Sequence, residues 1–181
     1  MSANPYDPFV ELDRTFSEIP KGASKNNDNT LNTKALQIFQ RNNGLFHWPD
    51  LLKEYRLVIL AEAGSGKTWE TKKMATKLAK EGKGAFFLRL EFINGNFEDS
   101  FETESFEHFQ EWLKSEEEGW FFLDSVDEAR LSSPQDFERS IRRFKREICT
   151  ALHRTHVIIT GRVSAWRSKK DLNCCNEQLP F

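Results

Sequence analysis

The chain has 181 residues, of which 38% are hydrophobic and 30% charged, and its formal net charge is −2. This length suits one domain, and sixteen phenylalanines supply apolar material for its core. The small net charge gives no electrostatic reason to expect nucleic acid as a partner. The sequence also has no secretory signal, no apolar run of the roughly 20 residues that cross a bilayer, and no disulfide framework. We therefore expect a soluble, cytoplasmic protein.

The first fifty residues carry only weak patterns. Residues 21–30 are polar and lack hydrophobic periodicity, which is typical of a loop or linker. Residues 31–42 favour a short helix, because their apolar side chains recur at helical spacing. We therefore expect an N-terminal extension over residues 1–50 and a folded core over residues 51–181.

From residue 56 onwards, apolar strands alternate with amphipathic helices. The predicted strands are 56–61, 84–92, 120–125 and 155–160, and the predicted helices are 67–82, 105–117 and 134–153. Alternating elements with continuously apolar strands predict a parallel sheet with helices on both faces. The expected fold class is therefore a three-layer α/β fold.

The sequence AEAGSGKT, from Ala61 to Thr68, follows the first predicted strand and matches the phosphate-loop pattern G-x-x-x-x-G-K-[ST] except at its first position. In such a loop, backbone N–H groups surround the phosphates at a helix N-terminus. Gly64 and Gly66 allow close approach, Lys67 places a charge between the β- and γ-phosphates, and Thr68 offers a hydroxyl to Mg²⁺. Alanine is small and adopts a negative φ easily, so we interpret Ala61 as a tolerated variant. The predicted nucleotide-binding residues are Ala63, Gly64, Ser65, Gly66, Lys67, Thr68 and Trp69.

A second motif, WFFLDSVDEAR, ends an apolar strand with Asp124. A carboxylate at this end of a parallel strand is placed to hold Mg²⁺ beside the phosphate loop, together with Thr68. Asp127 and Glu128 follow closely and are candidates to polarise an attacking water. The alternative is an acidic turn that caps a helix; the phosphate loop upstream favours the metal site.

The last predicted strand, THVIIT, leads through Gly161 into Arg162. If this strand pairs between the strands of the two motifs, Thr160 or Arg162 can sense the γ-phosphate by a hydrogen bond or by charge. The alternative is an ordinary surface arginine after a strand.

The run DLLKEYRLVILAEAGSGKT, the phrase LDSVDEARL and the strand ending T-G-R together resemble NACHT-type NTPases, which belong to the STAND class of signal-transducing P-loop ATPases. The likeness is clearest to bacterial members, several of which act in antiviral defence, and it covers roughly Trp48 to Trp166. It implies the additional-strand P-loop fold, with sheet order 5-1-4-3-2 and the sensor strand between the strands of the two motifs. It also implies ATP and Mg²⁺ as ligands, and a nucleotide-gated switch.

The resemblance assigns roles to single residues. These are Gly64, Gly66, Lys67 and Thr68 for phosphate and metal, Asp124 for Mg²⁺, Asp127 and Glu128 for hydrolysis, and Arg162 as the sensor. The family continues past the point where this chain stops, so we expect the fifth strand to be missing or rudimentary. The first strand then presents an open edge, which favours self-association or a protein partner.

Two other functions stay open: a small phosphotransferase such as a kinase, and a non-catalytic nucleotide-binding adaptor. The acid pair that suits a water nucleophile, and the lack of an arginine-rich lid, weigh against a kinase. SKKD (168–171) matches the guanine-reading motif [NT]-K-x-D incompletely, so we expect ATP and not GTP. The basic stretch 139–146 favours a solvated helix face over a nucleic-acid surface. The cysteines and histidines between residues 149 and 175 fit no common zinc spacing.

Overall fold

The chain divides into two compact units, Met1–Lys53 and Glu54–Phe181. The computed structural model describes residues 14–19, 45–102, 104–126 and 135–180.

In the first unit, a two-residue strand β1 (Phe16–Ser17) pairs antiparallel with β2 (Leu45–Phe46), and a short helix α2 (Trp48–Leu51) follows. The rings of Phe16 and Trp48 meet edge to face, with centroids 5.2 Å apart. The helix expected over residues 31–42 lies outside the described residues.

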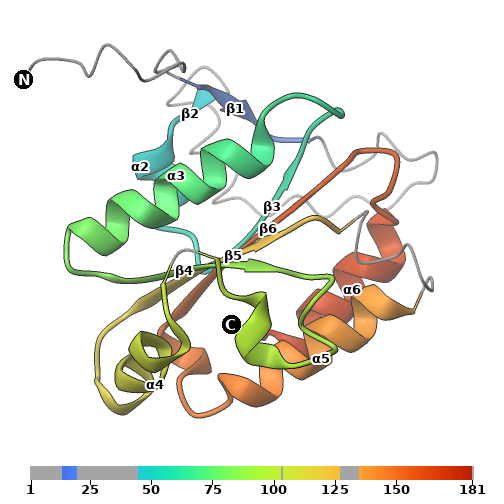
Figure 1. The fold of residues 1–181 in the computed structure, drawn as a ribbon. Helices are drawn as coiled ribbons and strands as arrows, with labels where there is room; N and C mark the ends of the chain where they lie inside the picture. The colour runs from blue at the N-terminus through green and yellow to red at the C-terminus, as the bar shows by residue number, and fades with distance from the viewer. Residues whose placement is uncertain (1–13, 20–44, 103, 127–134, 181) are drawn as a thin grey trace, which may run out of the picture. The chain divides into compact units, whose positions relative to one another are not determined.

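The second unit is built on a four-stranded parallel sheet (Figure 1). Its strands are β3 (Arg56–Leu60), β4 (Gly84–Arg89), β5 (Gly119–Asp124) and β6 (Thr155–Gly161), in the order β3-β6-β5-β4. The expected placement of the THVIIT strand between the strands of the two motifs is confirmed, because β6 pairs with both β3 and β5. In the part of the chain that the structure describes, no fifth strand adjoins β3.

Burial explains why these four segments form strands in this order. All seven residues of β6 are buried, as are most residues of β4 and β5, whereas β3 at the sheet edge is mostly half-buried. A strand that is covered on both faces reads as a continuous apolar run, and β6 has that character. The central position of β6 therefore follows from its composition.

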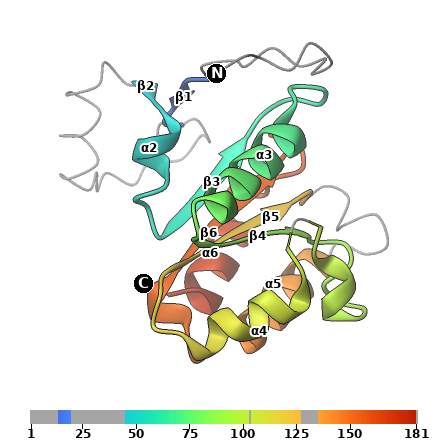
Figure 2. The same cartoon turned by 60° about the vertical axis from the view of Figure 1, so that its left-hand side comes forward.

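Helices cover both faces of the sheet (Figures 1 and 2). The 14-residue helix α3 (Lys67–Lys80) packs on one face against β4 and β5. The opposite face carries α4 (Phe106–Lys114), α5 (Asp136–Glu147) and α6 (Ser168–Gln178). The described residues of this unit also form the short 3₁₀ helices η1 (Phe97–Ser100) and η3 (Leu152–Arg154). The expected three-layer α/β arrangement is confirmed at this level.

Phenylalanine dominates the core. Alternate residues of the neighbouring strands β4 and β5 point to the face that carries α4 and α5; the rings of Phe86 and Phe121, for example, lie 4.9 Å apart. They pack against Phe109 of α4 and Phe144 of α5, which are also fully buried. Burying each such side chain contributes about 2–3 kcal/mol, so the aromatic cluster supplies much of the stability of this unit.

Trp112 of α4 lies directly on two glycines at the start of neighbouring strands. Gly84 and Gly119 are register partners, and a Cβ added to them would lie 2.4 Å and 2.5 Å, respectively, from atoms of the Trp112 ring. Both positions therefore exclude any side chain because the indole ring fills the space.

The structure departs from several of the predicted elements. The strand expected over residues 84–92 ends at Arg89, and the helix expected over residues 105–117 ends at Lys114. The helix expected over residues 134–153 extends only over Asp136–Glu147, and η3 then leads into β6. Helix α6 was not predicted, since its sequence is polar and few of its residues are buried. Asp171 stabilises the start of α6: one carboxylate oxygen accepts the backbone N–H of Arg167 at 2.7 Å.

Candidate functional site

The loop between β3 and α3 has the backbone of a glycine turn. Gly64 and Gly66 adopt φ values of +72° and +79°. A Cβ on Gly64 would meet nothing within 4 Å, so conformation and not crowding requires glycine there. Ala61 extends the β3–β6 ladder by donating its N–H to the carbonyl of Gly161 at 3.2 Å. Ala61 is not among the residues with positive φ, so alanine fits this position without strain.

The loop ends at the N-terminus of α3. Gly66 precedes the helix and has no side chain to cap it, so the first N–H groups of α3 lack the usual side-chain acceptor. The Oγ atom of Ser65 is buried and has no hydrogen-bond partner among the described residues. Lys67 folds back over the loop, and its Nζ atom donates to the carbonyls of Ala61 and Glu62, each at 3.0 Å. The loop therefore gathers a cation and several donors around one point.

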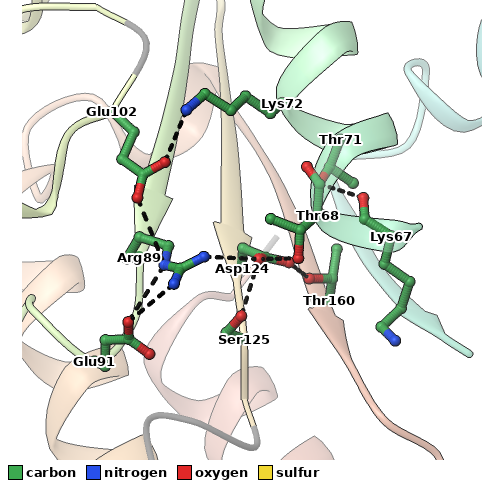
Figure 3. A network of polar contacts seen from close by, with 10 residues as sticks. All are labelled: Lys67, Thr68, Thr71, Lys72, Arg89, Glu91, Glu102, Asp124, Ser125 and Thr160. Atoms are coloured by element: carbon green, nitrogen blue, oxygen red, sulfur yellow. Dashed lines mark hydrogen bonds and ion pairs between the residues drawn. The ribbon is translucent and has the colours of Figure 1, made fainter. Parts of the chain in front are cut away.

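Asp124 lies at the carboxyl end of β5 with only 1% of its surface exposed. The hydroxyl of Thr68, at the start of α3, donates to its Oδ2 atom at 2.7 Å, and Ser125 donates to the same oxygen at 2.9 Å. Thr160 of β6 donates to Oδ1. These contacts join residues from α3, β5 and β6 at one edge of the sheet (Figure 3). A buried carboxylate is costly unless it is hydrogen-bonded or paired, and these hydroxyls meet that need.

The backbone next to Asp124 is unusual. Ser125 has φ of +70°, the one positive φ at a non-glycine residue in the described part of the chain. This conformation turns the chain sharply after β5, and the N–H of Val126 donates to the carbonyl of Thr160 at 3.1 Å. Such strained residues gather at functional sites because the surrounding structure must hold them in place.

A second group of charges adjoins Asp124. Arg89 ends β4 and is the register partner of Asp124; its Nη1 atom lies 3.8 Å from Oδ2 of Asp124. The same guanidinium contacts Glu91 at 3.2 Å and Glu102 at 3.6 Å, and Glu102 also pairs with Lys72 of α3 at 2.9 Å (Figure 3). The sequence analysis did not identify this group. The charged residues directly after the apolar FFL run were the available signal.

The remaining predicted site residues lie in different surroundings. Asp127 and Glu128 lie outside the described residues. Arg162 follows β6 on the surface, and its carbonyl accepts the N–H groups of Ala165 and Trp166. Ala63 is exposed in the loop, and the ring of Trp69 lies 4.9 Å from Nζ of Lys73. Of the two candidates for the sensor, Thr160 contacts Asp124.

A hollow of about 1060 Å³ lies elsewhere, along the exposed side of α5. Its lining is largely basic and includes Arg139, Arg142 and Arg146. Three arginines of this helix pair with acids on the same helix: Arg139 with Asp136 at 3.0 Å, Arg142 with Glu138 at 4.0 Å and Arg143 with Glu147 at 2.9 Å. Such pairs are typical of a solvated helix face. The lining of the hollow shares Glu91 with the charges around Arg89 but includes neither Asp124 nor the loop between β3 and α3.

The cysteines do not form a metal centre. Among the described residues, no group of three or more His, Cys, Asp or Glu side chains is arranged to hold a metal ion. Cys149 is exposed, whereas Cys174 and Cys175 are buried in α6. Burial raises the pKa of Cys175 to about 12, so its thiol stays protonated and is a poor ligand at neutral pH.

Comparison of the sequence with known protein families and with curated proteins finds no match. Among the described helices, none combines the length and the apolar character needed to cross a membrane. The site itself, with its loop, its helix N-terminus and its buried carboxylate, is therefore the basis for a functional assignment.

Proposed function

We propose that the chain is the ATP-binding and ATP-hydrolysing core of a signalling switch, a P-loop NTPase of the additional-strand type that resembles the NACHT proteins of the STAND class. Its ligands are ATP and Mg²⁺. The contact between Thr68 and Asp124 carries this proposal, because it joins the last residue of the phosphate-loop pattern to the acid of the second motif at 2.7 Å.

The residues of the site fit the chemistry of Mg²⁺ with a nucleotide. Oxygen ligands are what Mg²⁺ prefers, and Thr68 and Asp124 offer a hydroxyl and a carboxylate side by side. The unsatisfied Oγ of Ser65 and the uncapped N-terminus of α3 are donors that suit phosphate oxygens. Thr68 and Asp124 would hold Mg²⁺ there, and the ion would supply positive charge to neutralise the phosphates.

The loop residues have separate roles in this proposal. Gly64 and Gly66 keep the backbone close to the phosphates, and Lys67 exchanges its two carbonyl contacts for phosphate oxygens. The exposed Ala63 and the half-buried Trp69 flank the phosphates and the base or ribose. The strand order β3-β6-β5-β4 supports the additional-strand type, since β6 separates the strands of the two motifs.

For hydrolysis, we propose that Asp127 and Glu128 orient the attacking water and that Arg162 senses the γ-phosphate. The turn at Ser125 directs the chain away from the end of β5, and the two acids follow within three residues. Arg162 stands directly after β6, whose Thr160 reaches Asp124. Antiviral defence as the biological setting, and cytoplasmic location, rest on the resemblance and on the composition alone.

Calorimetric titration with Mg²⁺ and a non-hydrolysable ATP analogue tests the site. We expect Lys67→Ala to weaken binding roughly 30- to 1000-fold, because a charge-assisted phosphate contact contributes about 2–4 kcal/mol. Lys80→Ala, at the exposed end of the same helix, is the matched control and should bind like the wild type. Equal affinity in wild type and Lys67→Ala would contradict the phosphate-loop assignment.

Turnover is tested separately. We expect Asp127→Asn combined with Glu128→Gln to leave the affinity for ATP largely intact while lowering phosphate release, because these acids act on water and not on the ground-state phosphates. A kinase would instead transfer phosphate to an added acceptor. Tight ATP binding with no phosphate release by the wild type would favour the adaptor.

A further inference from the structure

Asp124 has one basic neighbour in the described part of the chain, and that neighbour comes from an adjacent strand. Arg89 and Asp124 are register partners at the ends of β4 and β5. The Nη1 atom of Arg89 lies 3.8 Å from Oδ2 of Asp124, the same oxygen that accepts the hydroxyl of Thr68. A cation that binds beside Thr68 and Asp124 therefore meets a guanidinium already directed at the shared oxygen (Figure 3).

The position of Arg89 does not depend on Asp124 alone. Its side chain, about one quarter exposed, is also held by Glu91 at 3.2 Å and by Glu102 at 3.6 Å. These two contacts are shorter than the 3.8 Å contact with Asp124. A guanidinium has five N–H donors in a planar fork, so it can give up one carboxylate and keep others. Arg89 thus has acceptors available on the side away from the metal ligand.

One of these acceptors, Glu102, is linked by an ion pair to α3, the helix that follows the loop. Lys72 of α3 pairs with Glu102 at 2.9 Å, and the backbone N–H of Glu102 donates to the carbonyl of Phe87 at 3.0 Å. Glu102 therefore stays beside β4 whichever carboxylate Arg89 contacts. Among the described residues, Lys72 forms its ion pair with Glu102 and not with Asp124, although it belongs to the same group of charges.

We propose that Arg89 is a positioning residue that sets the Mg²⁺ affinity of the site, by acting as the counter-cation that a divalent ion must displace from Asp124. This inference rests on the proposed function. Like charges that share one carboxylate weaken each other's binding, so Arg89 lowers the affinity for metal. When the metal is present, Arg89 remains bound to Glu91 and Glu102.

The test measures how strongly Mg²⁺ and nucleotide binding are coupled. The dissociation constant of a fluorescent, non-hydrolysable ATP analogue is measured in EDTA and in saturating Mg²⁺. The value in EDTA divided by the value in Mg²⁺ gives the ratio that is compared between variants. We expect Arg89→Gln to raise this ratio about tenfold, while the affinity in EDTA changes little. Arg89→Lys, which keeps the charge without the planar fork, should give an intermediate ratio and serves as the second variant if Arg89→Gln does not fold.

Lys72→Gln is the matched control, because it removes a neighbouring positive charge that contacts Glu102 and not Asp124. We expect it to change the ratio less than twofold. An equal rise of the ratio in Lys72→Gln and Arg89→Gln would overturn the proposal. The loss of any nearby positive charge, and not the loss of the contact between Arg89 and Asp124, would then be responsible. An unchanged ratio in both Arg89 variants would also overturn it, with the proposed function intact if the wild type still binds nucleotide with Mg²⁺. A wild type that binds no nucleotide would contradict the proposed function itself.

Discussion

Arg56 opens β3, the strand that leads into the phosphate loop, and it joins three distant segments of the chain. Its guanidinium donates to the backbone carbonyls of Tyr55 at 2.6 Å, Leu152 at 3.2 Å and Leu179 at 2.9 Å. Two further carbonyls, those of Thr155 and Pro180, accept from it as well. Because a guanidinium has five N–H groups, every one of its donors can be used in this clamp.

The loss of stability on replacing Arg56 can be worked out from these hydrogen bonds. Burial lowers the pKa of Arg56 from its ordinary value, but an arginine stays charged at neutral pH. Four of its hydrogen bonds are partly buried and one is exposed. At about 1 kcal/mol net for each partly buried bond, Arg56→Met should lower the free energy of unfolding by about 3–4 kcal/mol. For a domain of this size, that corresponds to a fall in melting temperature of about 12–15 °C.

Thermal and urea denaturation, followed by circular dichroism, measure this loss. Arg56→Lys retains a cation with only three donors, so we expect it to lose about 1–2 kcal/mol. Arg142→Met is the surface control, because the side chain of Arg142 is 59% exposed and its ion pair with Glu138 is 4.0 Å long; it should change stability by less than about 0.5 kcal/mol. An Arg56→Met variant that melts within about 2 °C of the wild type would refute the reasoning.

Three further predictions concern other parts of the second unit. Gly119→Ala should destabilise by about 2–3 kcal/mol in urea denaturation, because its Cβ would lie 2.5 Å from the Trp112 ring. Thr160→Val removes a hydroxyl that donates to Asp124, and we expect it to weaken Mg²⁺-dependent nucleotide binding about tenfold in the fluorescence titration. The pKa of Cys175 is raised to about 12 by burial, so stability should fall as the pH rises above about 9, where the unfolded thiol ionises first.

Each of these predictions has its own control. Gly95→Ala places a Cβ at an ordinary 3.5 Å from its neighbour, and a loss as large as that of Gly119→Ala would contradict the packing argument. Thr76→Val removes a hydroxyl that bonds within α3, to the carbonyl of Lys72, and should leave nucleotide binding unchanged. For Cys175, the alkaline loss of stability should diminish in Cys175→Ala; an identical pH profile would show that other groups cause it.

The strands could be predicted from the sequence because they depend on local composition, whereas the place of β6 between β3 and β5 was expected from the family resemblance. The run THVIIT is apolar throughout, and β6 is buried at every position. The phosphate loop was equally accessible, since the positive φ values of Gly64 and Gly66 follow from a pattern that needs glycine there. Asp124 was found because an acid at the end of an apolar strand stands out.

The charges around Asp124 could not be predicted in the same way. The contact of Arg89 with Asp124 depends on the register between β4 and β5, which no local pattern specifies. Glu102 reaches Arg89 only because the chain returns along β4 after η1, where its N–H meets Phe87. The clamp at Arg56 likewise depends on α6, a polar helix whose periodicity gives little signal.

Buried charges are compensated differently at the two ends of the strands. At the amino ends, Arg154 donates to the carbonyl of Trp112 at 3.1 Å and stacks on its ring at 4.3 Å, and Arg56 is satisfied by carbonyls alone. Because these acceptors are backbone carbonyls, they hold the two cations in fixed positions. At the carboxyl ends, Asp124 is 1% exposed but is held by hydroxyls, which can reorient, and by one ion pair of 3.8 Å.

Even with its hydrogen bonds satisfied, a buried charged pair is weak evidence for a purely structural role, because replacing the whole pair by well-packed apolar residues is often neutral or stabilising. Places where a sequence keeps a locally unfavourable group tend to be functional sites. In the proposed site, the hydroxyls of Thr68 and Thr160 and the guanidinium of Arg89 are the groups whose contacts with Asp124 a divalent cation would replace. We therefore infer that the groups that compensate the buried charge at the carboxyl ends of the strands can be exchanged, whereas those at the amino ends are fixed.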